Sequence, residues 1–327
     1  MTSPTRRAGS SPATRTTRPA SRPVGLEPDR TTPTTRARGG VTPVVLRQAL
    51  RATEAALTAR VAVRADAVEL MRVAHETAWK QIQERAPEAS ARDRADAAFA
   101  VASMSILRPE EIGKLRMVDS GQTRVVAFME AAARGRDPDR SFVAVDRTVG
   151  KGALDPRFAD GTDNQVFHTG FFVAAGYVSA GRVDQKAKTY LAAFVHETPL
   201  DPGVTSGKYS GMPSGGASQE DLRASLAGAM VGERLRELRD AGKGHLAGTI
   251  VAGVLARSVD LVPARLPAEQ HAEAVREILA LRRQQQRLSP VVDSPAVKAI
   301  VGPGPSPVLS LIKAWRRSFE AAQASEQ

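Results

Sequence analysis

Three short polar clusters stand in otherwise apolar, helix-like stretches of the chain and could do chemistry together. They are DNQVFH at 163–168, His196-Glu197, and DLRASLAG at 221–228. An imidazole or a carboxylate that a helix buries costs free energy unless it pairs, binds a metal ion or acts on a substrate. We therefore expect the three clusters to form one shared polar site.

Two kinds of chemistry fit such a site. His168, His196 and a carboxylate, for which Asp163 is the candidate, could hold a divalent metal ion with an open position that activates water. Alternatively, one histidine acts as a general base that Glu197 or Asp221 orients, without a metal ion. The candidate catalytic residues are His168, His196, Glu197 and Asp221.

Each of these residues also has a simpler explanation. Asp163 suits the N-cap of a helix, and His168 could be a hydrogen-bonded core residue. His196 could sit at a helix C-terminus, where the dipole favours it, beside a solvated Glu197. Asp221 falls in a first helical turn, where a carboxylate is favoured in any case.

Known motifs add little to this site. The zinc-protease pattern His-Glu-x-x-His is missing, because Thr198-Pro199-Leu200 follow Glu197. His75-Glu76 repeats the dipeptide on another predicted helix, so the dipeptide alone is a weak signal. Ser225 lacks the elbow motif of a nucleophilic serine. The glycines of 203–216 do not have the spacing of a phosphate-binding loop.

The order of the clusters resembles a known kind of domain. A histidine in an apolar helix, a second helix ending in His-Glu, a Gly-containing loop and then Asp-x-x-x-(Asn or Ser)-x-x-Gly is similar to uncharacterised all-α bacterial domains of secreted and toxin-associated proteins. The resemblance covers about 160–235, and this chain has Ser225 where the pattern has Asn. It implies that His168, His196, Glu197 and Asp221 line one pocket.

The composition bounds the class of protein. The chain has 327 residues, 42% of them hydrophobic and only 4% aromatic, so Ala, Val and Leu must fill the core, which favours close helix packing. Without cysteine, disulfides and thiolate metal sites are excluded. About half of the +11 net charge comes from eight arginines in 1–42, so the rest of the chain is not unusually basic.

The predicted fold is all-α and bundle-like, with long Gly/Pro loops. We expect three regions: a disordered Arg/Thr/Pro-rich tail at 1–42, an N-terminal helical region at 43–135 and a helical domain with the polar site at 136–327. Thr42-Pro43 should cap the first helix, and 44–85 reads as one helix near 60 Å long or two with a kink, which Pro87 ends.

Further helices are expected along the rest of the chain. They are predicted at 91–106, 110–117, 122–134, 164–180, 184–197, 218–240, 244–257, 267–287 and 306–325, with long loops at 135–162 and 198–217 and a short extended piece at 142–145.

Three functions follow from these features. The first is a hydrolase-like bacterial effector or toxin-associated enzyme. The second is a non-catalytic adaptor or structural protein of a secretion or phage-like assembly, with a protein partner. The third is a nucleic-acid-associated protein acting through its basic tail. No membrane span and no signal peptide are predicted, so we expect a cytoplasmic protein or one exported without a cleavable signal.

Overall fold

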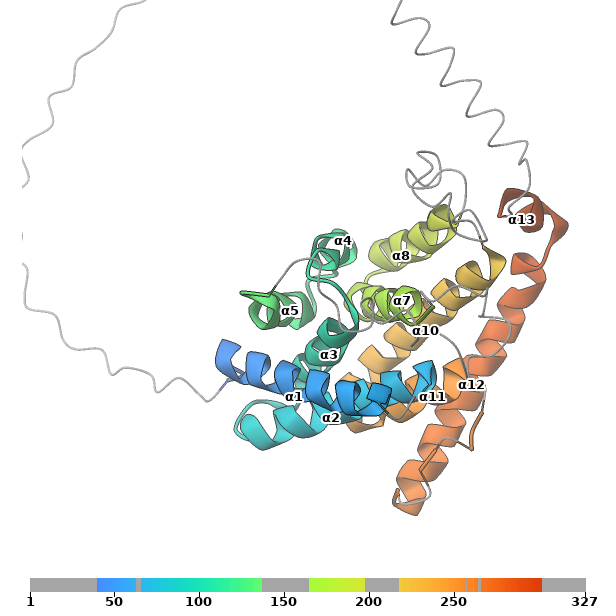
Figure 1. Ribbon diagram of the computed structural model, residues 1–327. Helices are drawn as coiled ribbons and strands as arrows, with labels where there is room; N and C mark the ends of the chain where they lie inside the picture. Colours follow the sequence, from blue (N-terminus) through green and yellow to red (C-terminus); the bar gives the residue numbers. More distant parts are fainter. Residues whose placement is uncertain are drawn as a thin grey trace, which may run out of the picture. The chain divides into compact units, whose positions relative to one another are not determined.

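Helices make up all the regular structure in the part of the chain that the computed structural model describes. These residues are 40–62, 66–136, 165–197, 218–256, 258–260, 262–263 and 266–301. Within them the all-α prediction is confirmed. Figure 1 shows α1 (Pro43–Ala62), α2 (Ala67–Arg85), α3 (Ala91–Ile106), α4 (Glu111–Val118), α5 (Val125–Ala133), α7 (Gln165–Ser179), α8 (Val183–His196), α10 (Gln219–Asp240), α11 (Ala247–Leu255), α12 (Ala268–Val292) and α13 (Pro295–Ile300).

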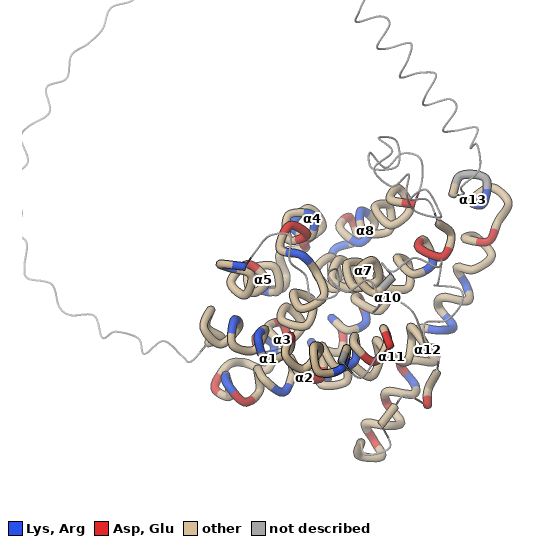
Figure 2. The backbone as a smooth tube through the Cα atoms, viewed as in Figure 1, with Lys and Arg blue, Asp and Glu red and all other residues tan. Residues whose placement is uncertain are grey.

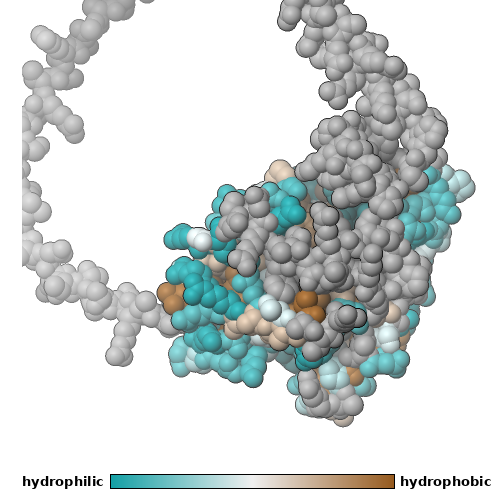
Figure 3. Space-filling model, in the orientation of Figure 1, coloured by the Kyte–Doolittle hydropathy of each residue, from teal (hydrophilic) through white to brown (hydrophobic). Residues whose placement is uncertain are grey.

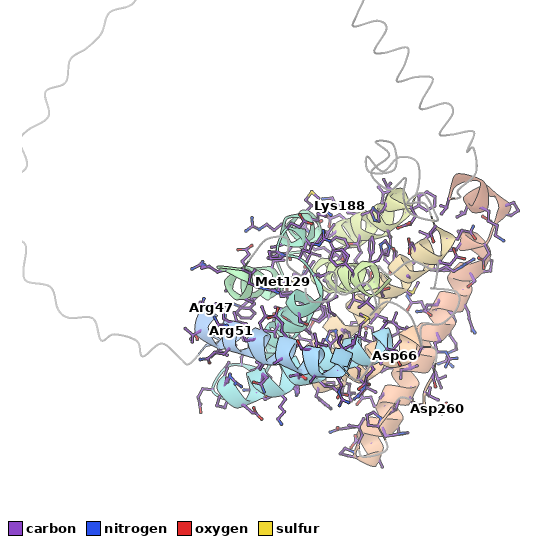
Figure 4. The ribbon with its side chains drawn as sticks, viewed as in Figure 1. Arg47, Arg51, Asp66, Met129, Lys188 and Asp260 are labelled. Carbon is purple, nitrogen blue, oxygen red and sulfur yellow. The ribbon has the colours of Figure 1, made fainter. Side chains whose placement is uncertain are left out.

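The prediction of one long helix at 44–85 is wrong, and its alternative of two helices is correct in their number. The first helix, α1, ends at Ala62, and α2 begins at Ala67 and packs against α1. Asp66, labelled in Figure 4, is extended and its side chain accepts a hydrogen bond from the Glu69 main-chain N–H at 2.8 Å. This N-cap starts α2 anew, and the Asp-x-x-Glu spacing of a capping signal is visible in the sequence.

Other helix boundaries follow their sequence signals closely. The hydroxyl oxygen of Thr42 accepts from the Val45 N–H, and α1 begins at Pro43 as predicted. The helix predicted at 91–106 coincides with α3, whose N-cap is Ser90. Ser218 caps α10 by accepting from the Asp221 N–H at 3.1 Å. Side-chain caps of this kind replace the hydrogen bonds that a helix end lacks.

The C-terminal part of the described chain differs in detail from the prediction. The stretch at 244–257 divides into a short 3₁₀ helix, η2 (Gly244–Leu246), and α11. Helix α12 runs to Val292 and contains Pro290 in its last turn, and α13 was not predicted. The tail at 1–42 apart from its last three residues, the loops, the extended piece at 142–145 and the helix at 306–325 lie outside the described residues.

One hydrophobic cluster joins helices from both sides of the region boundary expected at 135. It includes Leu46 of α1, Met129 of α5 (labelled in Figure 4), Tyr177 of α7 and Val251 of α11. Helix α7 carries no Lys, Arg, Asp or Glu, and is tan throughout in Figure 2. Its packing against α3, α4, α8 and α10 explains this, because a charge on such a helix would lose its hydration.

Helices α7 and α10 form the closest helix pair. A Cβ added at Gly176 would lie 2.1 Å from the Ala229 carbonyl oxygen, and one at Gly232 would lie 2.0 Å from the Val173 carbonyl oxygen. Gly228 lies similarly close to Thr169, so later residues of α7 meet later residues of α10 and the two helices run parallel. Glycine at 228 and 232 therefore allows the two helices to approach this closely.

Apart from α11, which also has none, the remaining α-helices carry charged residues. Lys and Arg alternate with Asp and Glu along most of them, and the described part of the face in Figure 3 is mainly hydrophilic with small hydrophobic areas. Among the described helices, none combines the length and the apolar character that crossing a membrane requires.

Candidate metal centre

The described residues of the three polar clusters lie together near the N-terminal ends of α7 and α10 and the C-terminal end of α8. His168 lies in the first turn of α7, and His196 is the last residue of α8, with Glu197 as its C-cap. Ser225 lies in the second turn of α10. Because α7 and α10 run parallel and α8 returns along α7, the starts of two helices and the end of the third gather at one place.

Two imidazoles face one carboxylate in this cluster. His168 Nε2 lies 3.2 Å from Glu197 Oε1, and His196 Nε2 lies 3.9 Å from the same oxygen. The two rings are stacked with their centroids 5.3 Å apart and their planes at 18°. One ligand atom of each residue lies within 4.8 Å of the other two, which is close enough for a common metal ion.

The carboxylate of Glu197 is buried without a full set of partners. The residue is 1% exposed, and its Oε1 accepts no hydrogen bond of acceptable geometry. The side chain of His196 is 36% exposed, so the cluster reaches the surface of the described structure on its side. The solvated Glu197 of the simpler explanation is therefore wrong. A buried carboxylate in this state favours a cation beside it.

Ser225 contacts the same ring nitrogen of His168. Its Oγ lies 2.5 Å from His168 Nε2 and donates to the main-chain oxygen of Asp221 at 2.8 Å. Which of the two atoms donates in their contact depends on the tautomer of His168. In a nucleophilic triad the serine and the carboxylate contact opposite nitrogens of the histidine, whereas Ser225 and Glu197 both face His168 Nε2.

The other predicted residues have different positions. Asp221 is half-buried and takes part in the cluster through its main chain, by its carbonyl oxygen to Ser225 and its N–H to Ser218. Asp163, the predicted carboxylate ligand, lies outside the described residues. Among the described carboxylates, Glu197 is the one that completes the cluster with the two histidines.

The second His-Glu pair, His75-Glu76, has no such cluster. His75 is 5% exposed, with its ring 5.7 Å from that of Phe99, and burial lowers its pKa to about 4. Glu76 forms an ion pair with Arg72 at 2.7 Å. A dipeptide of the same sequence is thus a packing feature in α2 and part of a polar cluster at the end of α8.

One buried polar group was missed by the sequence analysis. Asp96 is 1% exposed and accepts from Tyr177 Oη at 3.0 Å, from Arg239 at 2.5 Å and from the Arg124 N–H at 3.1 Å. Its signal was a lone carboxylate within the apolar run from Ala95 to Val101. Burial raises the pKa of the Tyr177 phenol, and the nearby negative charge of Asp96 raises it further.

The donor set suits a borderline divalent ion such as Zn²⁺. Two imidazoles and one carboxylate are the protein ligands of one well-known class of catalytic zinc sites, in which a fourth position takes water. Comparison of the chain with models of protein families, with curated proteins and with solved structures gives no match.

Proposed function

We propose that this protein is a metal-dependent hydrolase whose metal ion is held by His168, His196 and Glu197. The observation that carries the proposal is the buried Glu197 Oε1, which lies within 4 Å of two imidazole nitrogens and accepts no well-formed hydrogen bond. The resemblance to toxin-associated bacterial domains agrees with a hydrolytic effector, which stays a prediction.

The donor spacing supports a tetrahedral ion. With ligand bonds of about 2.0–2.1 Å, two donors of a tetrahedral site lie about 3.3 Å apart. His168 Nε2 and Glu197 Oε1, at 3.2 Å, fit this spacing. His196 Nε2 lies 3.9 Å from the carboxylate oxygen, and its half-exposed ring can move closer without repacking the core.

Each residue around the proposed metal ion would have a separate role. Glu197 supplies the negative charge that offsets the ion, and Phe172, with its ring centroid 5.3 Å from that of His168, holds that imidazole in place. His168 must give up its hydrogen bond to Ser225, whose hydroxyl keeps the Asp221 oxygen as its acceptor. When bound, the ion would act as a Lewis acid and lower the pKa of a water molecule beside it.

The test measures metal binding before activity. Full-length protein freed of metal is titrated with Zn²⁺ by calorimetry and with Co²⁺ by visible absorption, whose intensity reports tetrahedral coordination. We expect one ion per chain, and at least a 100-fold loss of affinity in His196→Ala and Glu197→Gln. His271→Ala, on α12, is the control that removes a histidine elsewhere and should bind as the wild type does.

Activity is then measured with peptide, ester and phosphodiester substrates, with and without Zn²⁺. Hydrolysis that depends on zinc and is lost in His196→Ala supports the proposal. Tight zinc binding with no hydrolysis of any substrate class would make the centre structural and contradict the hydrolase. Absence of stoichiometric binding would contradict the metal centre itself.

A further inference from the structure

We infer that a row of three arginines on α12 is a binding surface for duplex nucleic acid, contacted through its phosphates. Arg276, Arg283 and Arg287 are exposed. Their intervals of seven and four residues place them on one side of the helix, about 16 Å apart from first to last along its axis. The row does not share residues with the proposed metal centre and does not rest on that function.

The guanidinium groups of the row have no ion pair in the part of the chain that the structure describes. Two acidic residues of α12, Glu273 and Glu277, pair with a lysine and an arginine outside the helix. A third, Glu269, lies in the first turn, where the helix dipole favours it. From residue 278 onwards α12 has no acidic residue, so its second half carries only positive charge (Figure 2).

Helix stability gives no reason for this row. Arg283 and Arg287 lie one turn apart, and like charges at this spacing destabilise a helix. The helix dipole favours cations in the last turn, but the last turn of α12 contains no basic residue. A polyanion lying against the row would offset the repulsion between the arginines.

A regular, linear polyanion matches the row. Duplex DNA carries one negative charge for about every 1.7 Å of its axis, so it can meet all three guanidinium groups of a straight helix at once. Arginine binds phosphate through two parallel hydrogen bonds, and the exposed amides of Gln284 and Gln286 beside the row can bond to phosphate as well. The net charge of +11 also favours association with a polyanion.

Two other anionic partners match the row less well. A helix that binds a membrane surface presents an apolar face with Trp, Phe or Leu beside its basic residues. The exposed large apolar residues of α12 are Leu279 and Val291, and the helix has no aromatic residue. Single-stranded nucleic acid is held by stacking of its bases on aromatic side chains, which α12 cannot offer.

The experiment uses the full chain and a double variant of the row. Binding of a fluorescein-labelled DNA duplex of about 20 base pairs is followed by fluorescence anisotropy between about 50 and 200 mM KCl, with EDTA present so that the metal centre plays no part. Arg283→Gln/Arg287→Gln should bind at least about 10-fold more weakly at low salt. Its plot of log K against log[KCl] should be shallower by about 1.8, because each phosphate contact contributes about 0.9 to the slope.

The matched control is Arg47→Gln/Arg51→Gln on α1, whose two arginines Figure 4 labels. They also lie one turn apart without an ion pair among the described residues, and their loss lowers the net charge equally. The control should bind within about twofold of the wild type. Equal weakening of both variants would reduce the effect to overall charge and overturn the inference. Unchanged binding by the α12 variant would overturn it as well, since the duplex would then lie on another part of the chain.

Competitors identify the class of partner. A single strand of the same length, polyglutamate and vesicles containing phosphatidylserine are each added at a concentration of negative charge equal to that of unlabelled duplex. Displacement by any of them as effective as that by unlabelled duplex would overturn the inference in favour of a single strand, an acidic protein or a membrane. An unchanged melting temperature of both variants shows that a loss of binding is not a loss of fold.

Discussion

Asp96 and Glu197 are equally buried carboxylates in very different surroundings. Asp96 meets a permanent cation, Arg239, together with a phenol and a main-chain N–H. Glu197 faces two imidazoles, which carry a charge only when protonated, and one of its oxygens accepts no well-formed bond. At the first site the carboxylate has its partners within the chain, although the Nε of Arg239 has none. At the second site the carboxylate lacks a permanent positive charge beside it.

The comparison indicates that the buried charge of Asp96 has a structural role, whereas we propose a ligand-binding role for that of Glu197. A buried ion pair whose carboxylate is fully hydrogen-bonded contributes to holding helices together, here α3, α7 and α10. Removal of one partner leaves the other charge buried and uncompensated. A carboxylate left partly unmatched costs stability in the absence of a ligand, and proteins keep such groups where a ligand compensates them. Substitutions at the two sites should therefore have opposite effects on stability.

The largest effect is expected at Asp96. Asp96→Asn removes the charge opposite Arg239 and should lower the free energy of unfolding by about 3–5 kcal/mol, measured by urea denaturation at pH 7. Asp240→Asn is the matched control, since Asp240 pairs with the same Arg239 but its side chain is 39% exposed. That change should cost less than about 1 kcal/mol. Similar losses in the two variants would contradict a special role for Asp96.

A pH-dependent effect of about 2 kcal/mol is expected at His75, which shares a small cavity with Tyr177 and Arg239 beside this network. Burial lowers its pKa to about 4, from about 6.5 in the unfolded chain. Below pH 6.5 the unfolded state binds the proton more readily, so the stabilisation is complete above that pH and is lost as the pH falls toward 4. Between pH 7 and pH 5 the loss is about 2 kcal/mol.

His75→Leu should remove this part of the acid dependence. The quantity to compare is the difference in unfolding free energy between pH 7 and pH 5, which should be about 2 kcal/mol smaller in the variant than in the wild type. His271→Leu, on α12, controls for the loss of a histidine. Parallel pH profiles for wild type and His75→Leu would show that the ring is not held neutral by burial.

The helix boundaries and the polar cluster also show how much of the structure could be predicted from the sequence. Local signals sufficed for Ser218 and for α3, because a cap and a helix depend on residues a few positions apart. The clusters around His168 and His196 were recognisable as polar groups in apolar helices. Asp66 was missed although its Asp-x-x-Glu signal was present, since the uninterrupted apolar spacing of 44–85 outweighed it.

Burial of Glu197 could not be predicted from its neighbours. At a helix end before Pro199, a glutamate normally meets water, but here it is 1% exposed and lies beside His168 of α7. The partner of Asp96 was equally hidden, because Arg239 lies 143 residues away in the chain. Such pairings depend on which helices pack together, and the close approach of α7 and α10 at their glycines decides that.

Glu197→Gln should have a smaller effect of the opposite sign. Replacing the partly unmatched carboxylate by a neutral amide is expected to raise the unfolding free energy of the metal-free protein at pH 7 by about 1 kcal/mol. Added Zn²⁺ should stabilise the wild type and leave the variant unchanged. A loss as large as that of Asp96→Asn would mean that Glu197 is a structural carboxylate like Asp96, and the comparison would fail.

The smallest effect is expected at Ser225, and it concerns affinity. Ser225 Oγ lies 2.5 Å from His168 Nε2, so a metal ion must displace this contact to reach the nitrogen. Ser225→Ala removes a bond of about 1 kcal/mol and should tighten Zn²⁺ binding by about fivefold, measured by competition with a chelator. Ser179→Ala is the control, because Ser179 is also buried and donates to the main chain of its own turn, at the other end of α7. If Ser225→Ala instead weakened binding, the hydroxyl would be holding His168 in its ligating position. The affinity of the site for a metal ion would then depend on Ser225 as well as on Glu197.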